Sequence, residues 1–368
     1  MSIDKTPPAK TPAAKTPSAK EPATRLPATR KPRWKLVWHD EFDGDTVDRS
    51  KWDFDIGNGF YDYKNHAWVE GWGNEELQYY THEPENVTVS DSCLRIRAVK
   101  APLHGCGYTS ARLKTKKRDG TVLFATCYGR VEFRAQVPWG KGLWPALWML
   151  PVDDAYGGWA ASGEIDLMEI VGEKPHEVLN SIHFGSTYPK RSLITTVHPL
   201  PAGSGVSDWH VYSVEWEPGE IRFYVDGVHT CTYDHWWSCS RRKDGAGLQP
   251  GRPADLNPWP APFDQPFYLL MNVAVGGNFP GVPNDQTRFP AELVVDYVRV
   301  YDKVGGYGPV KPIGPGRFPW QREAAPLAKA APRPPRKTPA TAPARRPAKK
   351  TPPKAPPKAS PKTRAEPR

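Results

Sequence analysis

Three carboxylates within six residues constrain this chain more than any other feature of its sequence. In the stretch Ser162–Val171 the acids Glu164, Asp166 and Glu169 are separated only by apolar residues. A strand sends alternate side chains to opposite faces, so Glu164 and Asp166 share a face, whereas Glu169 would turn inward. One extra residue, a β-bulge, would return Glu169 to the acidic face. An amphipathic helix is the alternative, but acid–apolar alternation with Ile and Val is more typical of a strand.

Carboxylates gathered on one face repel each other, so one of them should keep its proton near neutral pH. Cleavage of a glycosidic bond with retention needs this combination, because one ionised carboxylate attacks the sugar and one protonated carboxyl protonates the leaving oxygen. The two groups then lie ~5–5.5 Å apart. A solvated acidic strand face and a calcium site are the alternatives that spacing leaves open.

The segment Glu164–Glu169 resembles the E-x-D-x-x-E signature of glycoside hydrolase family 16, in its laminarinase-like branch. The resemblance extends from Trp38 to Tyr301. Position 111 is Ala where relatives often carry Gly, but the signature is intact, so the non-catalytic, glucan-recognising relatives match poorly. Further similar blocks follow one another along the chain: Gly71–Thr81, Tyr108–Leu113, Tyr128–Glu132, Gly140–Pro151, Val275–Asn278 and Val295–Tyr301.

The resemblance implies an all-β fold, a β-jelly-roll sandwich of the concanavalin A type with a substrate cleft. The residues agree, because many short alternating segments separated by turn signals predict a sandwich. Asp91-Ser92 and Asp226-Gly227 are expected hairpin turns, and 57–82 is expected to be a long irregular loop. The predicted strands are Leu36–Phe42, Val87–Ser90, Leu94–Ala98, Tyr128–Val137, Ile182–Phe184, Val211–Trp216, Ile221–Val225, Phe267–Asn272 and Leu293–Tyr301.

The resemblance also assigns roles to residues. Glu164 is the expected nucleophile, Glu169 the expected acid/base, and Asp166 the residue between them that helps to set the charge of the nucleophile. The expected substrate-binding residues are Asn74, Arg112, Trp144, Trp148 and His183, although a histidine with a purely structural role fits position 183 nearly as well.

Two further acids, Glu41 and Asp296, resemble those near the structural calcium site of many relatives. Oxygen ligands suit calcium, but an Asp at the start of a strand has many other uses. Catalysis itself is expected to need no cofactor.

Charge divides the chain into three parts. Residues 1–33 hold eight Lys/Arg and two acids, and residues 303–368 hold 17 Lys/Arg and two acids, whereas 34–302 hold 25 basic and 36 acidic residues. The two basic segments are rich in Pro, Ala and Lys and poor in large apolar residues, so we expect disordered tails around a catalytic domain at 34–302. Such tails resemble those of linker histones and suit polyanions such as nucleic acid; a solubilising spacer is the alternative.

The compartment is left open by the residues themselves. No apolar segment typical of a secretory signal or a membrane span is found, although the family resemblance suggests extracellular action by a monomer. Five cysteines leave an odd one, and Cys231 with Cys239 could close a short loop, but spacing cannot fix the pairing.

The sequence therefore favours a retaining endo-glycosidase that acts on β-1,3-glucan or mixed β-1,3/1,4-glucan. Other members of the family cut marine galactans, and the linkage is left open. A different class remains as an alternative, a polyanion-binding structural protein whose hydrolase-like domain is a glycan-binding anchor.

Because the tails hold all of the excess positive charge, residues 34–302 alone should bind DNA more weakly than the full chain. Binding by the full chain should also fall steeply with salt, as counterion release requires. Fluorescence anisotropy with a labelled duplex at several salt concentrations measures both. Equal affinity of the tailless domain and the full chain would contradict the role given to the tails.

Overall fold

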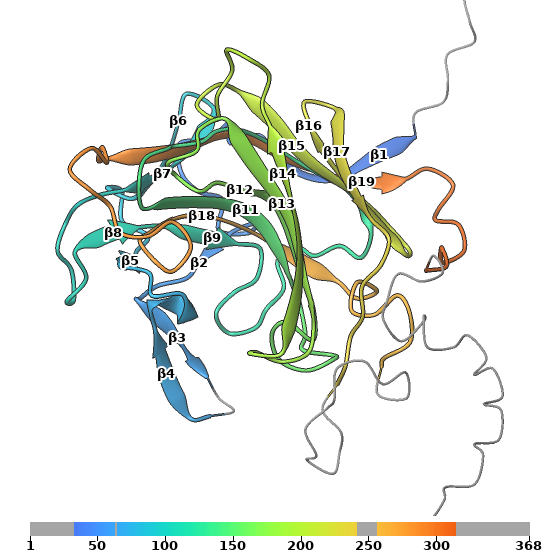
Figure 1. Ribbon diagram of the computed structural model, residues 1–368. Coiled ribbons are helices and arrows are strands. Elements are labelled where there is room, and N and C mark those ends of the chain that lie inside the picture. The colour runs from blue at the N-terminus through green and yellow to red at the C-terminus, as the bar shows by residue number, and fades with distance from the viewer. Residues whose placement is uncertain (1–32, 63–64, 241–255, 314–368) are drawn as a thin grey trace, which may run out of the picture. The chain divides into compact units, whose positions relative to one another are not determined.

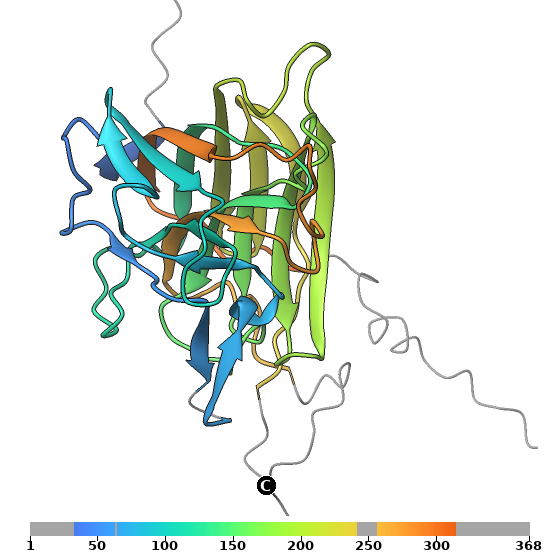
Figure 2. The same ribbon diagram turned by 90° about the vertical axis from the view of Figure 1, so that its left-hand side faces the viewer.

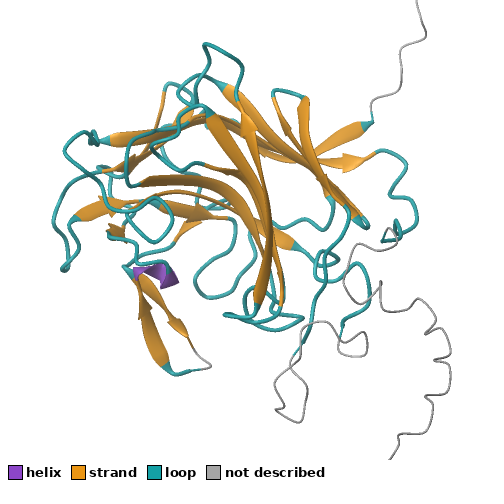
Figure 3. Cartoon of the chain, viewed as in Figure 1, coloured by secondary structure: helices purple, strands orange, loops and turns teal. Residues whose placement is uncertain are grey.

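The computed structural model describes residues 33–62, 65–240 and 256–313, which form two packed antiparallel sheets (Figures 1 and 3). Sheet A has the order β17-β16-β15-β10-β19-β7-β6, with β1 also paired to β19. Its strands are β17 (Val228–Tyr233), β16 (Glu220–Val225), β15 (His210–Glu217), β10 (Gly129–Gln136), β19 (Ala291–Lys303), β7 (Cys93–Ala98), β6 (Val87–Ser90) and β1 (Trp34–Asp40).

Sheet B has the order β14-β13-β12-β11-β18-β9-β2, and Figure 2 shows the long strands of both sheets side by side. The predicted all-β sandwich is thus confirmed. The strands of sheet B are β14 (Arg191–Pro199), β13 (Glu177–Gly185), β12 (Glu164–Glu169), β11 (Leu143–Pro151), β18 (Phe267–Val275), β9 (Arg112–Lys114) and β2 (Asp53–Phe54).

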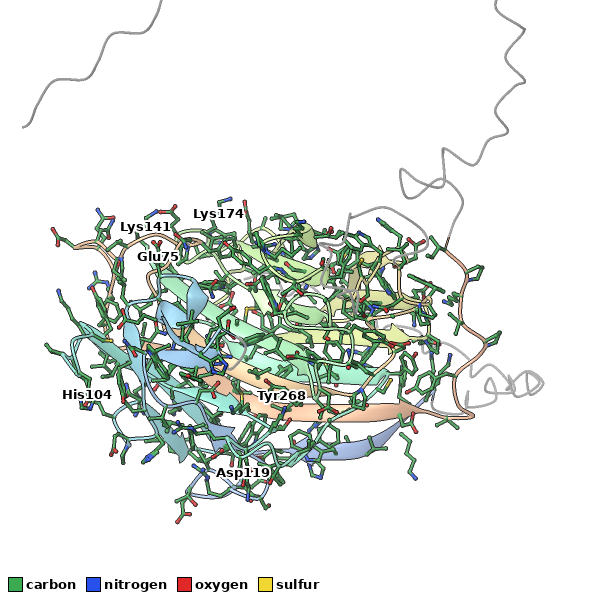
Figure 4. All side chains as sticks on the ribbon, turned by 90° about the horizontal axis from the view of Figure 1, so that it is seen from below. Glu75, His104, Asp119, Lys141, Lys174 and Tyr268 are labelled. Carbon is green, nitrogen blue, oxygen red and sulfur yellow. The ribbon has the colours of Figure 1, made fainter. Side chains whose placement is uncertain are left out.

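The core lies between the two sheets, where side chains fill the interval (Figure 4). In β10 the alternation predicted from sequence is observed, with Val131 and Phe133 buried and Glu132 between them partly exposed. Leu147 of β11 and Leu269 of β18 are fully buried from the opposite sheet. Each such side chain contributes about 1.5–3 kcal/mol relative to an exposed one.

The predicted bulge in β12 is confirmed by its pairing with both neighbours. Against β11 the register runs from Met168, opposite Leu147, directly to Asp166, opposite Trp148, so Leu167 is the extra residue. The pairing with β13 shifts over the same stretch. Leu167 and Met168 are both completely buried, and the acids on either side of them therefore face the same way.

Both predicted hairpin turns are present. Asp91 and Ser92 join β6 to β7 with φ values of 55° and 51°, and Asp226 and Gly227 join β16 to β17 with 51° and 75°. Two central residues with positive φ characterise the type I′ turn, whose twist matches that of paired strands.

The expected irregular loop at 57–82 is wrong in part, because this segment contains paired strands. Strands β3 (Gly59–Asp62) and β4 (Ala67–Glu70) form a hairpin, followed by the short 3-10 helix η1 (Gly71–Gly73) and by β5 (Gln78–Tyr80), which pairs with β8 (Tyr108–Ser110). Tyr61 and Trp68 are opposite each other and both exposed. When the aromatic side chains of a hairpin are exposed, its sequence does not alternate between apolar and polar residues, and this alternation is the signal by which strands are predicted.

Strands β11 and β14 were not among the predicted strands. The residues of β11 are mostly apolar on both faces, so they show no alternation, and β14 is the edge strand of sheet B. Position in the sheet, and not local sequence, accounts for both.

The domain continues past the predicted boundary at residue 302. Strand β19 ends at Lys303, the amide of Lys311 donates to the carbonyl of Pro218, and the indole of Trp259 donates to the carbonyl of Lys311. Residues 303–313 therefore pack on the sandwich. The remainder of both predicted tails lies outside the described residues.

All five cysteines are thiols, so no disulfide joins Cys231 to Cys239. Among the described residues, no helix could cross a membrane.

An ion-pair network on the outer face of sheet A ties the two ends of the domain to its middle. Glu217 of β15 accepts hydrogen bonds from Arg33, Arg222 and Lys303. Burial opposes ionisation of this carboxyl, but the bonds from Lys303 and Arg222 outweigh it and lower its pKa from 4.5 to about 2. The network therefore stabilises the ionised form of Glu217 in the folded state.

Replacing Glu217 with Gln should lower the free energy of unfolding at neutral pH by about 3 kcal/mol. A lowered pKa gives stabilisation that is complete above the unfolded value of 4.5 and is lost as the pH falls towards about 2. The difference between wild type and Glu217→Gln, measured by urea unfolding, should therefore shrink steadily below about pH 4.5. The control is Glu83→Gln, since Glu83 is exposed; a constant Glu217→Gln difference across this range would contradict the role of charge.

Candidate active site

The bulged strand β12 brings the three predicted acids to the face of sheet B that points away from the core. Residues opposite each other in an antiparallel pair share a face, and His183 of β13 is opposite Glu164, while Ser181 is opposite Asp166. Because the bulge buries two consecutive apolar residues, Glu169 faces the same side. We call Glu164, Asp166, Glu169 and His183 the acidic cluster.

Glu164 is the acid with a short hydrogen bond to a loop tryptophan. The indole nitrogen of Trp159 donates to its Oε2 at 2.6 Å. Burial raises the pKa of Glu164 to about 8, and the charge of Glu169 acts in the same direction. The bond from Trp159 and the positive charges of Arg112 and Arg191 oppose this shift, so they favour the carboxylate.

Asp166 lies deepest in the acidic cluster, with 2% of its surface exposed. Burial, followed by the charges of Glu164 and Glu169, raises its pKa well above the usual range. Its Oδ2 is buried without a hydrogen-bond partner and lies 3.5 Å from Nε2 of His183. Burial and the two neighbouring charges therefore favour the protonated form of Asp166.

Glu169 receives two donors of its own. The indole nitrogen of Trp144 donates to Oε1 at 3.0 Å, and the hydroxyl of Ser181 donates to Oε2 at 3.2 Å. Burial raises the pKa of Glu169, and both hydrogen bonds act against that rise. Two buried carboxyls with separate donors can take different protonation states, which acid–base chemistry requires.

His183 is neutral in this environment. Burial and the positive charge of Arg191 lower its pKa to about 3. Nδ1 lies 3.4 Å from Nη1 of Arg191, a group that can only donate, while Nε2 faces Glu164 at 3.7 Å and Asp166 at 3.5 Å. The sequence prediction placed His183 among the substrate-binding residues, and the structure brings it into contact with the acids.

Arg112, another predicted binding residue, lies between two tryptophan rings. Its guanidinium carbon is 4.6 Å from the ring centroid of Trp72 and 4.8 Å from that of Trp148, and its Nε lies 3.0 Å from Asp55. The indole of Trp148 also donates to Asn272 at 2.8 Å. These contacts hold Arg112 and the ring of Trp148 in place, and the charge of Arg112 acts on Glu164.

The predicted residue Asn74 leads to an acid that sequence reasoning missed. Asn74 donates to Glu76 at 3.1 Å, as do Gln78 at 2.7 Å and Tyr80 at 3.4 Å. Burial raises the pKa of Glu76, while these bonds and the charge of Arg112 lower it. Glu76 was not identified because it lies in an aromatic block and has no second acid two residues away. Trp159, Ser181 and Arg191 were missed as well, since nothing in the sequence around them indicates a contact with the acids.

A cavity of about 390 Å³ is lined by Trp159, the indole donor to Glu164, and by Ser162 and Gly163, which precede Glu164 in the chain. Tyr268 of β18, labelled in Figure 4, forms part of its wall. The lining residues are Lys116, Leu150, Pro151, Val152, Asp153, Asp154, Trp159, Ser162, Gly163 and Tyr268. Polar and aromatic groups next to buried acids are typical of sites that bind small polar molecules.

The residues predicted to hold calcium are already engaged with cations. Arg299 forms a two-point ion pair with Glu41, and Arg134 bonds Asp296 at 2.6 Å. A guanidinium occupies the oxygen atoms that a metal would need, so this donor set does not fit a calcium ion as it stands. The calcium assignment stays a prediction.

Comparison with known proteins gives matches over most of the described chain. The model of the glycosyl hydrolases family 16 matches residues 74–238. The chain is 44% identical over 278 residues to glucan endo-1,3-beta-glucosidase A1 of Niallia circulans, covering 72% of this chain and 37% of that protein. It is 42% identical over 277 residues to a beta-glucanase of Rhodothermus marinus, covering 73% and 86%. The chain thus spans little more than a third of the first relative and most of the second.

Solved structures agree with these relatives. The laminarinase of Rhodothermus marinus aligns with a TM-score of 0.58 at 39% identity, over 74% of this chain and 98% of that one. The laminarinase catalytic domain of Thermotoga maritima aligns with a TM-score of 0.59 at 38% identity, over 73% and 98%.

The two indole donors should control the two outer acids separately. Trp159→Phe removes a donor that favours the carboxylate, so the pKa of Glu164 should rise above about 8, and Trp144→Phe should raise that of Glu169. Loss of a hydrogen bond to a charged group corresponds to about one pKa unit. Carbon-13 NMR titration of glutamate-labelled protein measures the midpoints.

Trp148→Phe is the matched control, because its indole donates to Asn272 and not to an acid. It should leave both midpoints unchanged. Equal shifts of both acids in each of the two test variants would show that the donors do not act separately.

Proposed function

This chain belongs to glycosyl hydrolase family 16, and from that membership we propose that it cleaves internal bonds of β-1,3-glucans with retention of configuration. As a member of the family it is a hydrolase of glycosidic bonds. The observation that supports the proposal most is the acidic cluster, in which two carboxyls with different donors lie on one face of β12. The relatives named above are a glucan endo-1,3-beta-glucosidase and a beta-glucanase.

The proposed reaction has two displacements. In the first, Glu169 gives its proton to the leaving glycosidic oxygen while the carboxylate of Glu164 attacks the anomeric carbon, forming a covalent glycosyl ester. In the second, the carboxylate of Glu169 takes a proton from water, and that water breaks the ester. Two inversions leave the product with the β configuration of the substrate.

Burial is the largest cause of the raised pKa of Glu164, so this assignment needs a proton on Glu169. Glu164 must be ionised while Glu169 is protonated, and the charge of Glu169 is one cause of the raised pKa of Glu164. Protonation of Glu169 removes that repulsion, so the pKa of Glu164 falls when the acid is ready to act. The indole of Trp159 then stabilises the carboxylate, and the raised pKa of Asp166 limits the negative charge beside it.

The aromatic side chains beside the acids support a sugar polymer as the substrate. Trp144 and Trp148 are both partly exposed beside the acids, and Trp144 packs on Phe279 at 5.2 Å. Sugar rings have apolar C–H faces that stack on aromatic rings, while Asn74, Arg112 and His183 offer polar groups for hydroxyls. We propose these five residues as substrate-binding residues. Reducing-end assays on laminarin, lichenan and agarose would identify the linkage.

Substitution of the acids tests the roles. Glu164→Gln keeps the shape but removes the attacking charge, so turnover should fall by several orders of magnitude while glucan binding survives. Glu169→Gln should reduce hydrolysis of natural glucans strongly but spare the first step on substrates with a good leaving group, which need little protonation. Azide should then restore turnover of that variant and give a β-glycosyl azide.

Asp166→Asn should have a milder effect than either substitution, since Asp166 acts through its neighbours. Proton NMR during the first minutes of hydrolysis decides the stereochemistry, because retention requires the β-anomer to form first. An initial α-anomer would overturn the assignment of Glu164 as nucleophile.

The polyanion-binding alternative depends on the basic tails. Their residues 1–32 and 314–368 lie outside the described structure, so that role stays a prediction, as does a monomeric state.

A further inference from the structure

The acidic cluster contains a set of ligand atoms with the spacing of a metal site. One ligand atom from each of Glu164, Asp166 and His183 lies within 4.8 Å of the others. Nε2 of His183 is 3.7 Å from Oε1 of Glu164 and 3.5 Å from Oδ2 of Asp166. In a tetrahedral zinc site with bonds of about 2.0–2.2 Å, neighbouring ligand atoms are about 3.3–3.6 Å apart. Small side-chain movements would therefore suffice to bind an ion.

A second observation points to a ligand at the same place. Oδ2 of Asp166 is buried, has no hydrogen-bond partner and is aimed at the imidazole. Burying such an oxygen without a partner is costly, and a cation would satisfy it, with release of the proton of Asp166 to solvent on binding. Glu164 and His183 remain slightly exposed, with 14% and 13% of their side-chain surface open, so an ion can reach the site and keep a water as its fourth ligand.

The ligand types select the kind of ion. An imidazole and two carboxylates suit zinc and copper(II), whereas calcium and magnesium prefer oxygen ligands alone. To bind through Nε2, the ring must carry its proton on Nδ1, and the guanidinium of Arg191, 3.4 Å from that atom, must turn away.

We propose that Glu164, Asp166 and His183 bind one divalent transition-metal ion, with zinc as the reference ion, and that the bound ion blocks the acidic cluster. An ion coordinated by Glu164 takes up the electron pair that the nucleophile needs. Occupation of the site and glucan hydrolysis are then mutually exclusive, and a chelator reverses the block. The binding half of the proposal rests on the geometry alone, and the inhibition half rests on the proposed function.

Isothermal titration of the full chain with zinc chloride tests the binding. We expect one site per chain that is weakened at least about tenfold by His183→Asn and by Asp166→Asn, as loss of a ligand costs no less than loss of its outer partners. Arg191→Leu should act in the opposite direction and tighten binding, because it removes the competing donor and the positive charge. The copper(II) complex should show coupling to one imidazole nitrogen in its paramagnetic resonance spectrum.

The matched control is His198→Asn. His198 lies on β14 opposite Val178, away from the acidic cluster, so its replacement should leave zinc affinity unchanged. Near-ultraviolet circular dichroism identifies any variant that has lost its fold. Zinc affinity that is absent in the wild type, or unaltered in both folded ligand variants, would overturn the proposal.

Laminarin hydrolysis by the wild type tests the inhibition. Activity should fall in step with zinc occupancy and return with EDTA. Zinc binding at this site with full hydrolysis would overturn the block, whereas failure to hydrolyse laminarin at all would count against the proposed function and leave the titration to decide the metal site.

Discussion

The extra residue in β12 is the constraint on which the rest of the site depends. With Leu167 and Met168 both buried, Glu169 lies on the same face as Glu164 and Asp166. A regular strand would have placed Glu169 in the core, where an unpaired charge is very unfavourable. The bulge thus serves packing and chemistry together, because the two apolar side chains that it directs inward hold the acids in position.

Because the three acids share a face, their negative charges would repel each other, and the structure gives each acid a different environment. Asp166 is the most buried, which favours its protonated form, while Glu164 and Glu169 each receive an indole N–H from a different element. Trp159 belongs to the loop before β12 and Trp144 to β11, so the two donors respond to different parts of the fold. This separation allows one carboxyl to act as a base while the other acts as an acid.

The two faces of the sandwich use charge in opposite ways. On the outer face of sheet A, carboxylates such as Glu217 are matched by Arg222 and Lys303, and the pKa is lowered. In the acidic cluster of sheet B, burial raises the pKa of each acid, and the charges of Arg112 and Arg191 oppose this shift for Glu164 without reversing it. The paired charges around Glu217 stabilise the domain. The acids of the acidic cluster can instead hold protons or bind a cation, and the proposed hydrolysis and the proposed metal site depend on these two properties.

The sequence by itself determined the features that rest on local order: the alternating strands, the two hairpin turns, the acids of β12 and the bulge between them. Only the tertiary structure showed the partners that come from distant positions, such as Trp159 and Ser181 for the acids, Arg299 for Glu41, and the contact of His183 with Asp166. Alternation depends on neighbours in the chain, whereas these contacts depend on sheet register and on loops folded over a sheet. The hairpin β3–β4 was missed for the same reason, because its exposed aromatic pairs leave no periodic pattern in the sequence.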